Sequence, residues 1–486
     1  MTTFSRRSFV AGISAAVPFT IWFEKNGLFA QQTRIRPNVA STQGQAMLNI
    51  YANAVRTMMN TPERNPVGWL FQWYTHGVRD DNNRTKATEI ARVYPTPSPQ
   101  KTLAQQAWET CQAHHDGDIE DYFLPWHRMY LLFFERIIQK VSGNANFALP
   151  YWDYTNTSSR LPPRFINPGN TSNSLFRQSR RSSVNAGNPI DAGSPGLLNL
   201  NALRQCTYSP VGSAIPGFNM DLDMNLHGRV HVRVGNDVGM GQIPWAANDP
   251  IFYLHHCNID RLWASWNSAG RRNPNTTSWL NKTFVFADEN GARVVGKVSD
   301  FRDIASLRYR YEQLATVPTC PPGAGAAGPP RRVRVATALQ LSSTPAKVRL
   351  LPPPGPGAGL SDLATRVRNL SGNRRLYLVI KKLSAQAAPG THFDVFLELP
   401  GDVTGSAAEA NKIGSIHFFD AVAHGGHAPA AANANQKFFS FDITDLAKRL
   451  AAAGRLTATP ELTIAPADEV NATARPVVGE IELIEQ

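Results

Sequence analysis

Histidines occur in this chain in an arrangement that demands converging helices. The sequence holds twelve histidines in 486 residues. One lies early, and two short windows follow it: His76; then His114, His115 and His127; then His227, His231, His255 and His256. Neutral imidazole is the commonest protein ligand for metal ions. A fold that brings these windows together would therefore build a metal centre.

The second window predicts two helices. His227 and His231 are four residues apart, which places two imidazoles on one helical face. That spacing alone is weak, but a helix with a defined start follows, because Asp249-Pro250 supplies an N-cap and a first-turn proline. His256 lies on this helix, and Asp260, four residues on, is placed to orient a ligand or its neighbour. Three nitrogens from two helices leave coordination positions open.

The first window predicts a long helix that starts at Pro125, with His127 in its first turn. Glu135 follows two turns later, where it would hold the second nitrogen of a ligand or pair with Arg128. His76 is the remaining earlier histidine, so it is the candidate for a further ligand.

Six neutral imidazoles without a carboxylate or thiolate among them favour copper. Catalytic zinc sites often include a carboxylate, so a dinuclear zinc hydrolase is a rival from another class. Iron and nickel also bind imidazole, and ligand type alone leaves the metal open. We expect two copper ions that face each other.

The hydrophobic pattern changes along the chain. Residues 31–317 carry apolar residues three and four apart, as in 126–141, which predicts helices joined by irregular loops. A Pro/Gly-rich linker is expected over 318–370. Residues 371–486 contain runs of strand length, such as 392–399, with Gly and Pro between them. The predicted fold is mainly α, a helical bundle followed by a C-terminal antiparallel β-sandwich.

Residues 1–30 resemble a twin-arginine export signal. Arg6 and Arg7 precede an apolar run from Phe9 to Phe23, which contains Pro18 and is short for a membrane span. Such a signal is an address and not an anchor. We therefore expect export to the periplasm or the medium, without a stable membrane anchor.

Charge and cysteine spacing argue against two classes of protein, nucleic-acid binders and cysteine-based zinc proteins. The net charge is +12, but nucleic-acid binding needs a clustered basic stripe. The one dense basic cluster lies in the expected linker, at Arg331, Arg332 and Arg334. The cysteines match no zinc motif, and an oxidising compartment permits one or two disulfides with open pairing: Cys111, Cys206, Cys257 and Cys320.

Several stretches resemble the type-3 dicopper family of tyrosinases, polyphenol oxidases, catechol oxidases and haemocyanins. Residues 123–128, Phe-Leu-Pro-Trp-His-Arg, resemble its copper A helix, and 227–263 resemble its copper B region. Residues 147–153 are similar to the stretch after copper A, and 309–311 to the Tyr-x-Tyr pair that ends the core. More loosely, residues 392–395 resemble the C-terminal domain of plant polyphenol oxidases.

The resemblance implies an enzyme that oxidises phenols and catechols to o-quinones with O2, with monophenol ortho-hydroxylation as a further activity. A haemocyanin-like O2 carrier and an o-aminophenol oxidase are alternatives at the same centre. The implied ligands are His76, His114 or His115, and His127 for copper A, and His227, His231 and His256 for copper B. His255 is then structural.

The chain departs from the family pattern near copper A. An insertion over 116–121 leaves both His114 and His115 as the second ligand. Cys111 lies where some members form a thioether to a copper A histidine. Ile243 falls at the position over the copper A mouth, which makes it a candidate substrate gate.

A further departure follows the first copper B ligand. Gly228 stands where several monophenol hydroxylases carry Asn, which works there with a carboxylate that Asp221 or Asp223 would supply. The C-terminal domain is expected, by analogy, to cover the copper mouth and keep the chain latent. His424 and His427 are expected in a solvated loop.

Overall fold

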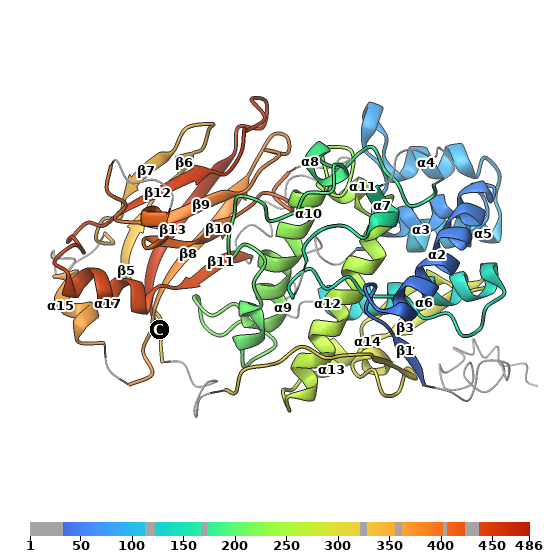
Figure 1. Cartoon of the computed structure of the whole chain (residues 1–486), viewed down its shortest axis with the longest axis horizontal. Helices are drawn as coiled ribbons and strands as arrows, with labels where there is room; N and C mark the ends of the chain where they lie inside the picture. Colours follow the sequence, from blue (N-terminus) through green and yellow to red (C-terminus); the bar gives the residue numbers. More distant parts are fainter. Residues whose placement is uncertain are drawn as a thin grey trace, which may run out of the picture.

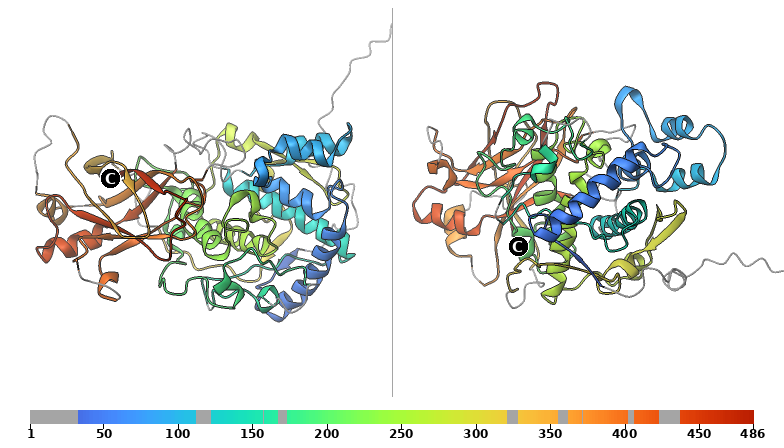
Figure 2. Two further views of the ribbon diagram at one scale, coloured as in Figure 1. Left: turned by 90° about the horizontal axis from the view of Figure 1, so that it is seen from above. Right: turned by 45° about the vertical axis from the view of Figure 1, so that its right-hand side comes forward.

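The computed structural model describes residues 33–111, 122–156, 158–166, 173–320, 328–354, 362–370, 372–401, 406–422 and 437–486. Helices coloured blue to yellow-green occupy one side of the molecule, and strands coloured orange to red occupy the other (Figure 1). Two further views show the same division (Figure 2). The change from helices to strands that the hydrophobic pattern predicts is therefore present.

Three long helices form the centre of the helical part. Helix α2 (Thr42–Asn60) packs on α6 (Phe123–Ser142), and α6 packs on α12 (Ile251–Ser268). Nearly every side chain of α6 and α12 is buried, including polar and charged ones such as Arg128 and Asp260. Helix α12 begins directly after Pro250, whereas α6 begins two residues before the predicted Pro125.

Shorter helices surround this centre. They are α3 (Trp69–His76), η1 (Asp81–Asn83), α4 (Lys86–Val93), α5 (Pro99–Ala107), α7 (Pro163–Ile166), α8 (Ser182–Asn185), η2 (Asn201–Arg204), α9 (Gly217–Asp221), the π-helical turn η3 (Leu222–His227), α10 (Gly228–Val234), α11 (Ile243–Ala246), α13 (Thr277–Asn281) and α14 (Val298–Phe301). Strand β1 (Arg34–Arg36) pairs in parallel with β4 (Tyr309–Tyr311), and β2 (Thr283–Ala287) pairs antiparallel with β3 (Arg293–Lys297).

The C-terminal part contains two antiparallel sheets. One has the order β10-β9-β12-β7, and the other has β11-β8-β13-β5 with β6 also on β13. One hydrophobic cluster includes side chains from both sheets, such as Ile380 and Ile464. The strands are β5 (Arg331–Ala336), β6 (Leu339–Gln340), β7 (Ala346–Arg349), β8 (Leu376–Ser384), β9 (Phe393–Leu397), β10 (Lys412–Ile416), β11 (Phe438–Asp442), β12 (Glu461–Pro466) and β13 (Val477–Glu485), with helices α15 (Leu363–Arg368), α16 (Ser406–Glu409) and α17 (Thr444–Ala452).

The expected linker over 318–370 is shorter than the sequence indicated. Strands β5, β6 and β7 and helix α15 lie inside it, so regular structure begins at Arg331. The arginine cluster of the expected linker is part of β5, at the end of a sheet, where charged side chains are favoured. A disulfide joins Cys206 of the helical part to Cys320, while Cys111 and Cys257 are buried and are not part of this disulfide.

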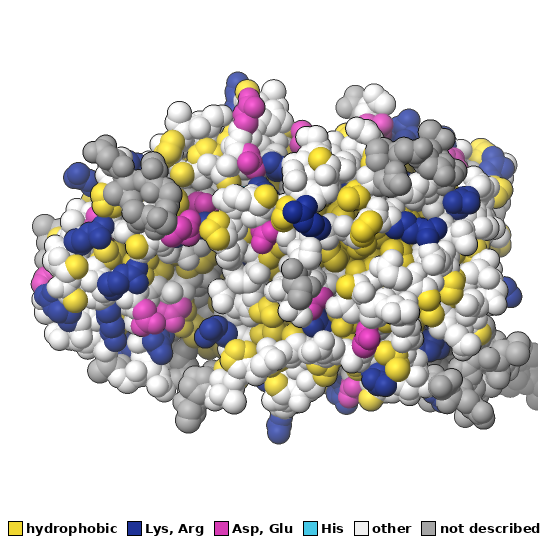
Figure 3. Space-filling model, viewed as in Figure 1, with side chains coloured by type: hydrophobic (Ala, Val, Ile, Leu, Met, Phe, Trp, Pro, Cys, Tyr) yellow, Lys and Arg dark blue, Asp and Glu magenta, His cyan; other side chains and the backbone are white. Residues whose placement is uncertain are grey.

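The two parts are in direct contact. Met220 and Met224 of the helical part belong to the hydrophobic cluster of the C-terminal sheets. On the face in Figure 3, Lys and Arg side chains are scattered among acidic and neutral ones. Within the described residues, every helix is too short or too polar to cross a membrane. The expected export signal lies outside the described residues.

Candidate metal centre

Five helical elements bring His76 and the described histidines of both windows to one buried place. Helix α3 ends at His76, and α6 carries His127 near its start. The π-helical turn η3 ends at His227, α10 carries His231, and α12 carries His255 and His256. Each of these six side chains is at most 2% exposed. Such burial of six polar rings requires partners inside the protein.

The described histidines form two adjoining groups. Possible ligand atoms of His227, His231, His255 and His256 lie within 4.8 Å of one another. Those of His76, Cys111 and His127 form a second such group. The rings of His127 and His256 stack across the groups, with centroids 4.2 Å apart and an interplanar angle of 8°.

Hydrogen bonds to the backbone set the orientation of three rings. A carbonyl oxygen only accepts, so the ring nitrogen facing it carries the proton and the other nitrogen keeps its lone pair. In each case Nδ1 faces the carbonyl and Nε2 is left for a metal: His76 with Ile243 at 3.2 Å, His127 with Phe123 at 2.8 Å, and His231 with Met240 at 2.8 Å. Metal-binding histidines commonly have such a carbonyl partner.

The remaining rings also suit a metal. The Nδ1 of His227 lies 3.0 Å from an oxygen of Asp223, and the Nδ1 of His255 lies 2.9 Å from the Tyr154 hydroxyl. The Nε2 atoms of His227 and His255 have no hydrogen-bond partner. Leaving a buried polar atom unsatisfied costs about 1–3 kcal/mol, and a metal ion would satisfy such a nitrogen. The residues present therefore fit imidazole-bound copper.

Burial favours the neutral form of His76, His127, His231 and His256. Desolvation, helped by the nearby His227, lowers the pKa of His76 to about 3. Desolvation also holds the pKa values of His127, His231 and His256 well below the ordinary range. Neutral imidazole is the form that binds a metal, so metal binding needs no deprotonation at physiological pH.

The second predicted copper A ligand lies outside the described residues, since both His114 and His115 fall in 112–121. Cys111 is described and is 2% exposed. Its Sγ lies 3.6 Å from the Nε2 of His127. The sulfur is thus beside the metal-facing nitrogen of one predicted ligand.

Asp260 lies in a buried ionic cluster and holds a neighbour of a histidine. It accepts hydrogen bonds from Arg128 Nε at 2.5 Å, Arg36 Nη1 at 3.2 Å, the Tyr309 hydroxyl at 2.6 Å and the Tyr311 hydroxyl. Arg128 directly follows His127 in α6. These partners of Asp260 are arginines and tyrosines, so an orienting role toward the histidines stays a prediction.

The predicted contacts of Glu135 are wrong. It accepts from Arg36 Nε at 2.9 Å and from the backbone N–H of Leu149 at 2.8 Å. Arg128 pairs with Asp260 instead. The reason is β1, which inserts Arg36 between the two carboxylates, and helical spacing within α6 carries no information about that strand.

Phe419 of the C-terminal part covers the histidines. Its ring stacks on His231, with centroids 4.3 Å apart and 19° between planes, and it stands edge-on to His227 at 5.8 Å. It is 4% exposed and packs with Val232 and with Ile243, the predicted gate. The sequence analysis missed Phe419, because the Phe418-Phe419 pair after a strand carries no local signal of this contact.

Ion pairs join the two parts around the site. Lys437 Nζ lies 2.7 Å from the Asp223 carboxylate that also approaches His227. Desolvation opposes ionisation of Asp223, but the Lys437 charge and the His227 contact outweigh it and lower its pKa to about 2. Asp468 of the C-terminal part pairs with Arg181 and Arg233, at 2.7 and 2.8 Å.

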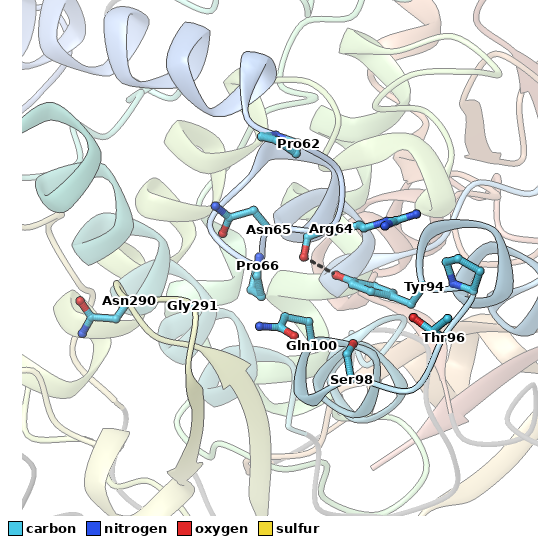
Figure 4. A pocket seen from close by; sticks show the side chains of 11 residues that line it. Pro62, Arg64, Asn65, Pro66, Tyr94, Thr96, Ser98, Gln100, Asn290 and Gly291 are labelled. Carbon is cyan, nitrogen blue, oxygen red and sulfur yellow. Dashed lines mark hydrogen bonds between the residues drawn. The ribbon is translucent and has the colours of Figure 1, made fainter.

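A separate pocket lies away from the histidines. Its volume is about 460 Å³, and Pro62, Arg64, Tyr94, Ser98 and Asn290 are among its lining residues (Figure 4). The Tyr94 hydroxyl donates to the Arg64 carbonyl, and Arg64 Nε donates to the Val93 carbonyl. These polar groups hold the loop together, and the lining contains no histidine, cysteine or carboxylate.

Comparison with known proteins assigns a family. Residues 66–194 and 177–269 match the common central domain of tyrosinase, and residues 273–319 match the polyphenol oxidase middle domain. Residues 334–486 match a domain of unknown function. The chain is 30% identical over 433 residues to tyrosinase HcTyr1 of Hahella sp. (strain CCB-MM4), covering 83% of this chain and 89% of that one. The chain belongs to the tyrosinase family. It is a dicopper oxidoreductase that oxidises phenols with O2.

Other relatives of this tyrosinase-family chain include the chloroplastic polyphenol oxidase of Vitis vinifera, 32% identical over 47% of this chain and 44% of that one. Among solved structures, latent apple tyrosinase has a TM-score of 0.59 at 20% identity, covering 94% of this chain and 98% of that one. A functional unit of octopus hemocyanin has a TM-score of 0.50 at 18% identity, covering 93% and 99%. These likenesses establish the helical fold of the family.

Proposed function

We propose that each copper ion is held by three imidazoles: copper A by His76, His127 and either His114 or His115, and copper B by His227, His231 and His256. When bound, the copper pair supplies the two-electron exchange between dioxygen and a phenolic substrate. The observation that carries this assignment for His76, His127 and His231 is the hydrogen bonding of Nδ1 to backbone carbonyls, which leaves Nε2 for the metal. His227 and His256 are included because their ligand atoms lie within 4.8 Å of those of His231.

We infer that the chain converts catechols to o-quinones, and that the aromatic ring of the substrate lies against His231. The Phe419 ring, stacked on His231 at 4.3 Å, supports this position because it demonstrates that a six-membered ring fits there. The surrounding buried side chains exclude water and fix the imidazoles, so the protein supplies geometry and a dry environment.

Diphenol oxidation is favoured over monophenol hydroxylation in the full-length chain. Hydroxylation needs a carboxylate free to take the phenol proton. Asp223 is engaged by Lys437 and His227, and Asp221 accepts from Gln205 at 2.8 Å and from Asn225 at 2.6 Å. An o-aminophenol differs from a catechol by one heteroatom, so we propose it as an alternative substrate at the same position.

The C-terminal part is proposed to be a β-sandwich that keeps the enzyme latent. Two antiparallel sheets that share one hydrophobic cluster support the sandwich. The ring of Phe419 over His231, and the ion pairs of Lys437 and Asp468 with the helical part, support the latency. We further propose export through the signal-like residues 1–30, ahead of secretion or residence in the periplasm.

Copper content of two adjacent variants tests the ligand assignment. His256→Ala is expected to lower bound copper from two ions per chain to about one and to abolish quinone formation from catechol. His255→Ala, its neighbour on α12, is expected to keep both ions. Copper retained by His256→Ala and lost by His255→Ala would reverse the assignment. Dioxygen uptake without quinone formation from catechol or o-aminophenol would instead indicate an O2 carrier.

A further inference from the structure

Gly228 lies where the C-terminal part leaves no room for a side chain. A Cβ atom at this position would lie 2.1 Å from Cε1 and 2.3 Å from Nε2 of His417, distances far below van der Waals contact. His417 follows strand β10 and is 1% exposed. Its ring therefore fills the space that the first side-chain carbon of any other residue at 228 would need.

Both ring nitrogens of His417 are hydrogen-bonded, so the ring cannot move aside without losing a hydrogen bond. Its Nε2 lies 2.8 Å from the carbonyl oxygen of Met224, and its Nδ1 accepts from the backbone N–H of Phe419 at 3.3 Å. These partners together require the tautomer with the proton on Nε2. The ring also stands edge-on to Phe439, with centroids 5.2 Å apart.

The π-helical turn before Gly228 prepares this contact. The N–H of Gly228 bonds to the carbonyl oxygens of Asp223 and Asn225, whereas the Met224 carbonyl accepts from His417. Isolated π-turns inside helices are frequent at functional sites. Here the turn both carries His227 and presents an acceptor to the C-terminal part.

The contact also fixes the register of the covering segment. Ser415 lies in strand β10, and His417 and Phe419 follow that strand. The Ser415 carbonyl accepts from Arg229 at 2.9 Å, His417 sits against Gly228, and Phe419 stacks on His231. Gly228, Arg229 and His231 of α10 thus all contact residues of one short segment, 415–419.

We propose that Gly228 is a docking notch for His417, and that this contact sets the register in which Phe419 covers His231. The inference rests on the proposed latency of the full-length chain. It follows that the covered state tolerates no side chain at 228, including the Asn that the resemblance associates with monophenol hydroxylation. Residue 228 therefore couples the substrate range of the site to its covering by the C-terminal part.

Hydrogen exchange in the full-length, metal-free chain tests the notch without relying on catalysis. Gly228→Ala is expected to speed amide exchange in the segment 415–419 about tenfold, and to raise catechol oxidation by the copper-loaded chain by a similar factor. Gly401→Ala is the matched control, because a Cβ there meets nothing within 4 Å, and it should change neither. If the amides of 415–419 exchange in Gly228→Ala at the wild-type rate, the proposal is overturned.

A second variant separates the notch from a general loss of stability. His417→Ala also removes two hydrogen bonds and is expected to speed exchange, but adding Gly228→Ala should then have little further effect, since both changes act through one contact. If the double variant speeds amide exchange by the product of the two single-variant factors, the proposal is overturned. If Gly228→Ala alone fails to fold, His417→Ala in the same chain should restore folded protein, and failure of that rescue also overturns it. A chain that shows these exchange rates but no oxidation would refute the proposed function and leave the notch intact.

Discussion

Phe419→Ala should raise catechol oxidation by the full-length chain. The Phe419 ring is buried at 4% exposure and stacks on His231, so truncation removes both apolar burial and an aromatic contact. Removing a buried phenylalanine costs about 3–5 kcal/mol, of which aromatic stacking contributes about 0.5–1.5 kcal/mol. If about 3 kcal/mol of this favours the covered state alone, the ratio of covered to open chains falls about a hundredfold. Catechol oxidation at low substrate concentration should rise by up to that factor.

The adjacent residue supplies the control. Phe418 is 2% exposed and packs against Phe393 inside the C-terminal part, with centroids 5.6 Å apart. Phe418→Ala therefore loses comparable burial at a site away from the histidines. Initial rates of quinone formation by both full-length variants, with equal copper content, measure the difference. Equal rates in Phe419→Ala and wild type, or equal activation by Phe418→Ala, would refute the covering role of Phe419.

Three further measurements address the scaffold. Asp260→Ala leaves the buried Arg36 and Arg128 without their carboxylate partner. Urea unfolding of the metal-free chain should show a free energy of unfolding lower by about 3–5 kcal/mol. The control variant Asp445→Ala, at an exposed position, should leave this free energy unchanged. Burial lowers the pKa of His392 to about 3 from 6.5, so between these pH values the unfolded chain binds more protons than the folded chain. As the pH is lowered from about 6.5 towards 3, the free energy of unfolding should therefore decrease, by up to about 1.4 kcal/mol per pH unit for this ring. His392→Gln should flatten a plot of Tm against pH over this range. Reducing the disulfide between Cys206 and Cys320, which are 114 residues apart, should cost about 4 kcal/mol, and an unchanged Tm in reductant would contradict it.

The features that the sequence predicted well are local. Helix α12 starts one residue after the predicted first-turn Pro250, which is itself the N-cap, and the Asp249 carboxylate accepts from the backbone N–H of Ile251 at 3.1 Å. The spacing of His227 and His231 survives the change from π-helical turn to α10, and their rings lie 4.5 Å apart. Helical spacing therefore predicts that His227 and His231 lie side by side, whereas His76 was a candidate only as the remaining earlier histidine.

The features that it missed are contacts between distant segments. Arg36 comes from a three-residue strand, and its pairing with Glu135 and Asp260 depends on β1 lying beside β4. Strand β5 was not predicted because a Gly/Pro-rich stretch precedes it and arginines occupy half of it. Short edge strands combine weak hydrophobic patterning with charge, which is also the composition of a linker.

Gly228 demonstrates how a distant contact changes the meaning of a residue. Compared only with the family pattern, it is a position that lacks the Asn of several monophenol hydroxylases. In the structure it is the position that admits His417, since any Cβ would overlap that ring. A segment nearly two hundred residues away thus explains on steric grounds why residue 228 is glycine. This explanation does not require that evolution selected for or against hydroxylation. Replacing Gly228 to gain hydroxylation should therefore first displace Phe419, so a gain in activity by such a variant is interpretable only after the change in covering has been measured.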